Sequence, residues 1–161
     1  DQEAVQYEEA FPENHGARYA GLYFVYLCAA RWPMGAVRLV DIQKINMAIG
    51  AHGQWKSRLR QAIESGYSEH AVGEVCRDDC CDFGRWLHAL PAEEQAGTDW
   101  KKVRELHAEF HKEAAAVLAL ALAGRKAEAG TALDPESSYV QTSLLLTAAM
   151  MDWMNHVQKT Y

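Results

Sequence analysis

Three histidines of this 161-residue chain, His52, His107 and His111, fall at positions where a helical pattern calls for an apolar side chain. A buried imidazole needs partners for its ring nitrogens, because an unpaired polar group in a core costs free energy. One such histidine is usually explained by a hydrogen bond to a backbone carbonyl. Three of them, two one helical turn apart, indicate a shared ligand instead. Imidazole and thiolate are preferred ligands of zinc, so these histidines and Cys81 predict a tetrahedral zinc site.

The apolar pattern around these residues predicts an all-α fold. Helix-forming residues are abundant, and no alternating pattern is long enough to indicate a sheet with one solvated face. We expect four helices, over residues 41–65, 80–90, 98–123 and 135–157. The expected starts are Asp41, Asp78 or Asp79, Thr98 or Asp99, and Asp134-Pro135, and the expected stops are Gly66, Pro91 and Gly124.

The composition excludes some classes of partner and compartment. The formal net charge is -6, and Lys and Arg form no stripe, so we expect no nucleic-acid partner. Cys80 and Cys81 are adjacent, which suits a disulfide framework poorly and favours a reducing, cytoplasmic compartment. The most apolar stretch, residues 20–30, is shorter than the roughly 20 residues of a membrane-spanning helix, so no membrane insertion is expected.

We divide the chain into an N-terminal segment of unassigned role, residues 1–39, and a helical domain, residues 40–158. The first residue is Asp rather than Met, so we expect the chain to be an excised or processed piece of a longer protein.

Rival metal chemistries lack residues that they need. A metalloprotease helix requires Glu directly after its first histidine, and Ala108 stands there. A zinc deaminase requires a downstream P-C-x-x-C, and no cysteine follows Cys81. A di-iron bundle would place carboxylates on the inward stripes beside the histidines, and the stripes of this chain carry none that pairs well. Four protein ligands also close a zinc site to water and substrate, so we expect no enzyme activity.

Three motifs carry a resemblance to a known family. They are His52-Gly-Gln-Trp55, Cys81-Asp-Phe-Gly84-Arg-Trp86 and His107-Ala-Glu-Phe-His111, and the likeness extends over roughly residues 41–157. Their order and spacing resemble those of the chemoreceptor zinc-binding domains. The resemblance implies a four-helix bundle with a 3-His/1-Cys zinc core. Such bundles occur, commonly as homodimers, in the cytoplasmic parts of bacterial chemoreceptors and in diguanylate cyclases that zinc inhibits.

The resemblance predicts a zinc-binding sensory domain of bacterial signal transduction or chemotaxis, linked to an output domain or a chemotaxis or cyclase partner. Its stimulus would be zinc itself or an oxidant such as hypochlorous acid that attacks the thiolate of Cys81. A structural zinc in a helical dimerisation or interaction module is the alternative, because ligand identity alone does not separate the two.

Residues near the expected ligands receive supporting roles. We expect Gly84 to leave room for the imidazoles beside the sulfur, and Trp55 and Trp86 to wall the site. The carboxylates considered for orienting a ligand histidine are those of Asp79, Asp82 and Glu109.

Other histidines and cysteines are expected to be spectators. For His88 we favour a hydrogen-bonded or solvent-facing role over ligation. His15, His70 and His156 lie outside the apolar stripes, Cys28 and Cys76 are expected to be core residues or spectators, and Cys80 is a candidate resolving thiol for oxidised Cys81.

Overall fold

The computed structural model describes residues 40–160, and the predicted all-α class is confirmed there: this part of the chain contains helices and no strand. The expected N-terminal segment, residues 1–39, lies outside the described residues, as do Cys28, His15 and the apolar stretch 20–30. Among the helices of residues 40–160, none has both the length and the apolar character needed to cross a membrane.

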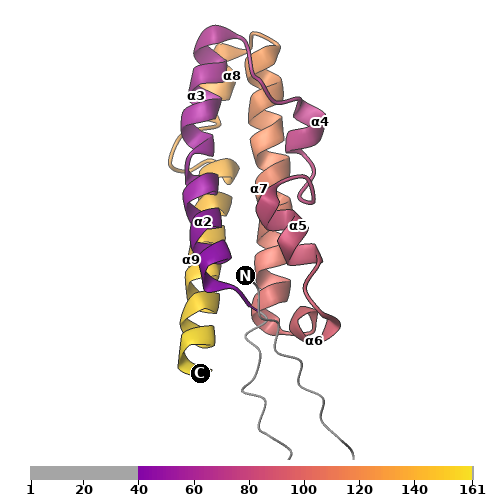
Figure 1. Cartoon of the computed structure of the whole chain (residues 1–161). Coiled ribbons are helices and arrows are strands. Elements are labelled where there is room, and N and C mark those ends of the chain that lie inside the picture. Colours follow the sequence, from indigo (N-terminus) through magenta and orange to yellow (C-terminus); the bar gives the residue numbers. More distant parts are fainter. Residues whose placement is uncertain (1–39, 161) are drawn as a thin grey trace, which may run out of the picture. The chain divides into compact units, whose positions relative to one another are not determined.

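Two long helices and one interrupted helical rod form most of the bundle (Figure 1). The helices are α2 (Ile42–Gly53), α3 (Trp55–Ser65), α4 (Val72–Val75), α5 (Asp82–His88), α6 (Ala92–Gln95), α7 (Thr98–Leu122), α8 (Lys126–Thr131) and α9 (Ser138–Thr160). The long helix α7 packs against α9 and α3, and α2 packs against α9. The short helices α4, α5 and α6 follow one another along α7 and take the fourth position of the bundle.

The first rod begins and ends as the sequence predicts but is not continuous. The Asp41 side chain accepts hydrogen bonds from the backbone N–H groups of Gln43 at 2.9 Å and Lys44 at 3.3 Å, and so caps α2. Gly66, with φ 71°, ends α3 in the left-handed conformation that glycine adopts without strain. The helix breaks at Gln54, directly after the Gly53 that ends α2, so the single expected helix is two.

Three of the expected helix starts are wrong in position. Cys81 itself, not Asp78 or Asp79, is the N-cap of α5. Gly97, rather than Thr98 or Asp99, precedes α7. The last helix begins at Ser138 instead of Pro135. At this observed start, the Ser137 hydroxyl accepts a hydrogen bond from the Val140 N–H at 3.4 Å. A polar residue near a helix start can therefore match the sequence pattern of an N-cap and still not be the residue that caps the helix.

The core is centred on the inward face of α7. The predicted stripe is buried along its whole length: Trp100, Val103, His107, Phe110, Ala114, Val117 and Ala121. Apolar residues of the facing helices close over it, among them Ile45, Leu59, Leu87, Leu146 and Met150. Each such side chain contributes about 1.5–3 kcal/mol when fully buried. His107 is fully buried within this stripe, so the metal-ligand candidates lie inside the core.

Candidate metal centre

The structure brings the four predicted ligand residues into one cluster. His52 comes from the last turn of α2, Cys81 from the start of α5, and His107 and His111 from successive turns of α7. One nitrogen of each histidine and the Cys81 sulfur all lie within 4.8 Å of one another. Three separate segments of the chain therefore meet at one point.

The distances within the cluster suit a tetrahedral metal ion. The Nε2 atom of His107 lies 3.1 Å from Nε2 of His52 and 3.2 Å from Nε2 of His111. It also lies 3.4 Å from Sγ of Cys81. Zinc with its usual bond lengths holds two nitrogens about 3.3 Å apart and a nitrogen and a sulfur about 3.6 Å apart in a tetrahedron. The three distances from His107 Nε2 are thus close to those that the ion requires.

Backbone carbonyls fix the orientation of two of the imidazoles. Nδ1 of His52 lies 2.7 Å from the Ala48 carbonyl oxygen, and Nδ1 of His111 lies 2.7 Å from that of Val75. A carbonyl only accepts, so each Nδ1 carries the proton and donates it. The neutral tautomer that remains has its lone pair on Nε2, the atom that faces the cluster. Both rings are thus prepared to bind a metal through Nε2.

His107 has no arrangement of protons that satisfies it within the protein alone. Its Nε2 faces two Nε2 lone pairs, and its Nδ1 is buried without a hydrogen-bond partner among the described residues. A proton on Nε2 can serve one neighbour only, and a proton on Nδ1 leaves three lone pairs converging. A cation at the centre removes this conflict, because all three lone pairs then become ligands.

Burial also keeps the histidines neutral, which is their metal-binding form. It lowers the pKa of His107 to about 2, helped by the nearby His52 and His111. The pKa of His52 falls to about 4, mainly through burial and against the bond to Ala48. The pKa of His111 is lowered as well, again by burial first. The core therefore disfavours protonated imidazole and leaves the nitrogens free for a metal.

Cys81 offers the fourth candidate ligand atom and at the same time caps α5. Its sulfur accepts a hydrogen bond from the Gly84 N–H at 3.1 Å, the position that an N-cap side chain takes. Burial raises the pKa of the Cys81 thiol, and the Gly84 N–H acts in the opposite direction. A bound divalent cation would supply the charge that a thiolate needs in this setting. Cys81 as a whole is half-buried.

Gly84 is required by the turn before α5 more than by the imidazoles. A Cβ atom at this position would lie 1.6 Å from the Asp78 carbonyl oxygen and 3.1 Å from Cε1 of His107. The first distance is impossible, whereas the second asks for a small shift only. Gly84 does leave room for an imidazole, as the sequence predicts, but the close approach of the Asp78 carbonyl is the stronger reason for a glycine here.

The walls of the cluster differ from the expected pair of tryptophans. Phe83 packs edge-on against the rings of His52 and His107, with centroids 5.9 and 5.2 Å apart. Phe110 packs against His52 in the same manner at 5.1 Å. Trp55 instead stacks on His70, and Trp86 packs between Phe83 and Trp153. The phenylalanines form the inner wall, and Trp86 supports it from behind.

None of the three acidic residues considered for orienting a histidine does so. Asp79 pairs with Arg77, Asp82 with Arg85, and Glu109 with Lys112, all at the surface. The orienting groups are the carbonyls of Ala48 and Val75, which sequence reasoning missed. For Ala48 a signal existed, since it lies one turn before His52. For Val75, which lies 36 residues from His111, there was none.

The other histidines and cysteines of residues 40–160 contribute no atom to the four-residue cluster. His88 is hydrogen-bonded, as expected, and its partner is Asp78. Cys76 is exposed and outside the cluster, so of its two expected roles, core residue or spectator, it has the second; the neighbouring Val75 is buried. Cys80 is half-buried, with its sulfur 3.7 Å from an Asp79 carboxylate oxygen.

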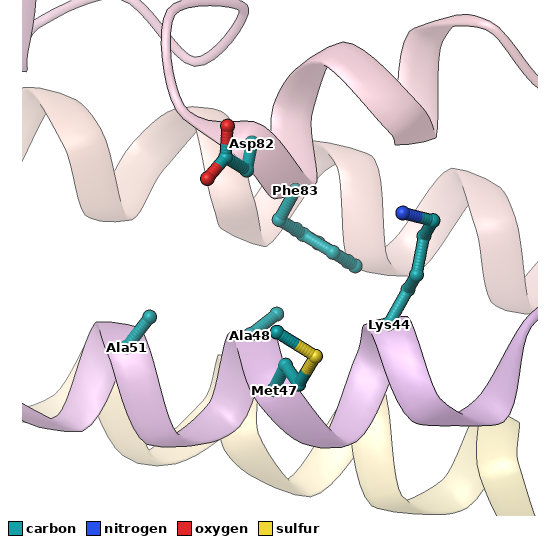
Figure 2. A pocket seen from close by; sticks show the side chains of 6 residues that line it. All are labelled: Lys44, Met47, Ala48, Ala51, Asp82 and Phe83. Atoms are coloured by element: carbon teal, nitrogen blue, oxygen red, sulfur yellow. The ribbon is translucent and has the colours of Figure 1, made fainter.

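A small surface pocket of about 180 Å³ lies between α2 and α5, directly beside the cluster. Figure 2 shows Phe83 reaching from α5 across the pocket towards α2. Its lining comprises Lys44, Met47, Ala48, Ala51, Asp82 and Phe83. Ala48 and Phe83 also contact His52, so only a thin layer of protein separates the pocket from the metal centre.

The fold and the site define a helical protein with a buried cluster of three histidines and one cysteine suited to a metal ion. Residues 52–118 match the model of the family described as "Chemoreceptor zinc-binding domain". This match confirms, over residues 52–118, the resemblance drawn from the three motifs. Neither a comparison with curated proteins nor one with solved structures found a match.

Proposed function

We propose that this domain binds one zinc ion through His52, Cys81, His107 and His111, and that the state of the site regulates a signalling protein. The observation that carries the proposal is the convergence of three Nε2 atoms and one Sγ, within 4.8 Å, inside an apolar core. The three Nε2 atoms that converge without enough protons to pair them, and the match to a zinc-binding family, support it. Zinc would supply the positive charge and the tetrahedral bonding that hold these ligands together.

A regulatory role suits the site better than catalysis does. All four ligand positions come from the protein, and Phe83 and Phe110 pack against the imidazoles, so no position remains for a substrate. We therefore assign no enzymatic activity to this domain.

The proposed signal depends on where the ligands lie. His52, Cys81 and the α7 histidines belong to three different helices, so the occupied site crosslinks α2, α5 and α7. A helix as short as α5 owes much of its stability to such tertiary contacts. When the Cys81 ligand is lost, we expect α5 and the preceding turn to shift or fray, and a joined output domain would read that movement.

Two stimuli are consistent with the chemistry of the site. One is the concentration of free zinc, which sets occupancy directly. The other is an oxidant such as hypochlorous acid, which Cys81 can meet because its side chain is half-buried. The thiolate sulfur attacks the chlorine and expels hydroxide, which gives a sulfenyl chloride and oxidises the sulfur by two electrons. Hydroxide then displaces chloride from this sulfur to give sulfenic acid, so the net change is RS⁻ + HOCl → RSOH + Cl⁻. Sulfenic acid is a poor zinc ligand, so the crosslink to α5 would be broken.

The wider setting of the domain is also a proposal. A cytoplasmic location fits the reduced cysteines of the described residues, and a homodimer fits the exposed apolar side chains Met47, Leu144, Leu145 and Met151. The partner would be an output domain of a chemoreceptor or a cyclase. Light scattering that gives a monomer mass at high protein concentration would contradict the dimer.

The alternative is a structural zinc that stabilises an interaction module without sensing anything. Both functions use the same ligands, so reversibility separates them. Elemental analysis of the purified protein should find one zinc per chain, and titration with hypochlorous acid should release it, as detected with a chromogenic chelator. Release at about one oxidant per site supports the sensor. Retention until the protein unfolds supports the structural role, and protein without zinc contradicts both.

A further inference from the structure

The turn that carries Cys81 is tied to the far end of α5 by a pair of side chains. Nε2 of His88, the last residue of α5, lies 2.9 Å from a carboxylate oxygen of Asp78. Asp78 precedes Cys81 by three residues, and the side chains of Asp78 and His88 are only 24% and 33% exposed. The pair therefore spans α5 from its C-terminal residue to the turn before its first residue.

The backbone of Asp78 lies against the metal-binding sulfur. Its carbonyl oxygen is 4.0 Å from Sγ of Cys81, and it lies so close to the backbone of Gly84 that a Cβ there would come within 1.6 Å of it. The turn 78–81 is thus folded back onto the first turn of α5. The position of the Cys81 sulfur depends on this fold, because Cys81 is the end of the turn and the cap of the helix.

The neighbouring acid shows that this arrangement is specific to Asp78. Asp79 turns outward and pairs with Arg77 at 3.0 Å on the exposed surface. Asp78 instead pairs with His88 at 2.9 Å, and both side chains are partly buried. Neither side chain is among the four ligand groups of the cluster.

We infer that Asp78 and His88 are positioning residues that act as one clamp, holding the turn 78–81 so that the Cys81 sulfur meets the three imidazoles. The inference rests on the proposed metal-binding function and adds two residues to it. Neither residue would touch the metal. Groups that orient metal ligands from behind typically contribute 10- to 100-fold to metal affinity, and the clamp should behave in the same way.

Cobalt(II) titration of the whole chain tests the clamp, because cobalt takes tetrahedral sites and its thiolate charge-transfer absorption reports the Cys81–metal bond. Asp78→Ala and His88→Ala should each weaken cobalt binding about tenfold and reduce this absorption per bound cobalt. The double variant should be no weaker than either single one, because the residues act as a unit. Asp79→Ala is the matched control and should bind cobalt as the unaltered protein does.

Conservative variants separate positioning from a general loss of folding. Asp78→Asn keeps an acceptor, and His88→Gln keeps an N–H donor at similar reach, so both should restore the absorption and most of the affinity. Circular dichroism checks that every variant stays helical. Unchanged affinity and absorption in both alanine variants would overturn the clamp, as would an equal loss in Asp79→Ala. If the unaltered protein bound no cobalt and no zinc, the metal-binding function itself would fall, and the clamp with it.

Discussion

Nδ1 of His111 donates a hydrogen bond to the carbonyl oxygen of Val75 at 2.7 Å, although the two residues are 36 positions apart. This bond joins α7 to the end of α4, and Val75 is itself buried. The candidate ligand His111 is therefore oriented by helix α4, which contains none of the four candidate ligands. The segment from α4 to α5 touches the cluster twice, through the Val75 carbonyl and through Cys81.

Loss of either a cysteine or a histidine ligand should remove the metal. We expect Cys81→Ala and His111→Ala to leave purified protein with little zinc, because a tetrahedral site loses a quarter of its bonds. Cys76→Ala is the control, since Cys76 is exposed, and it should retain one zinc per chain. Elemental analysis makes the comparison, and equal zinc in all three proteins would refute the ligand assignment.

The tautomers of two histidines can be checked directly. In the zinc-loaded protein His52 and His111 should both carry a proton on Nδ1, because carbonyls accept there at 2.7 Å, and bind the metal through Nε2. Long-range nitrogen–proton correlation spectra of labelled protein distinguish the two ring nitrogens. A protonated Nε2 on either residue would show that the metal is bound elsewhere or in another geometry.

The zinc-free protein should lose stability as the pH falls below neutrality. His52 and His107 have pKa values of about 4 and about 2 in the folded chain, against an ordinary value of 6.5. In the unfolded chain they take up protons near pH 6.5, so the unfolded state binds more protons below that pH. The stability is fully present above pH 6.5 and declines as the pH approaches 4.

Denaturant unfolding in the presence of a chelator, at several pH values between 7 and 4, measures this slope. His52→Leu should flatten it, since the variant has one buried imidazole fewer. His70→Ala should leave it unchanged, because His70 is exposed. A slope that is the same in His52→Leu as in the unaltered protein would count against burial as the cause.

Alanine at position 84 should harm both folding and metal binding. Its Cβ would lie 1.6 Å from the Asp78 carbonyl oxygen, so the turn before α5 would have to move. We expect a loss of about 3 kcal/mol or more in unfolding free energy, at the upper end for overpacked cores, together with weaker zinc binding.

Gly50→Ala provides the contrast to this variant. Gly50 lies in the interior of α2, and a Cβ atom added there would have no neighbouring atom within 4 Å, so alanine should stabilise the helix by about 0.5–1 kcal/mol. Thermal unfolding of the two variants should shift in opposite directions. A tolerated Gly84→Ala would mean that the turn is less tightly packed than its geometry indicates.

The sequence predicted those features that depend on spacing along a helix. The inward stripe of α7, with His107 and His111 one turn apart, follows from the helical period, and all of it is buried. His52 was predicted as a ligand in the same way, because it falls within the apolar stripe of residues 41–65, whereas Cys81 came from the ligand preference of zinc and from the motif resemblance. Both kinds of inference depend on neighbours within one segment.

Features that depend on how segments meet could not be predicted. Asp134-Pro135 is a strong local start signal, yet the chain makes a turn there and α9 begins at Ser138. The Val75 carbonyl carries no sequence signal, because every residue has one. The role of Gly84 beside the imidazoles was predicted, but its main role was not, since only the fold reveals that the Asp78 carbonyl lies over it.

The cap of α5 has a consequence for how such a site transmits information. The sulfur of Cys81 accepts the Gly84 N–H and also faces the three imidazoles, so one atom belongs both to the metal centre and to the first turn of a helix. In the proposed sensor, oxidation of that atom would weaken the helix cap in the same event, with no intervening relay of side chains. The group that reacts would then also be the group whose loss lets the first turn of α5 unwind.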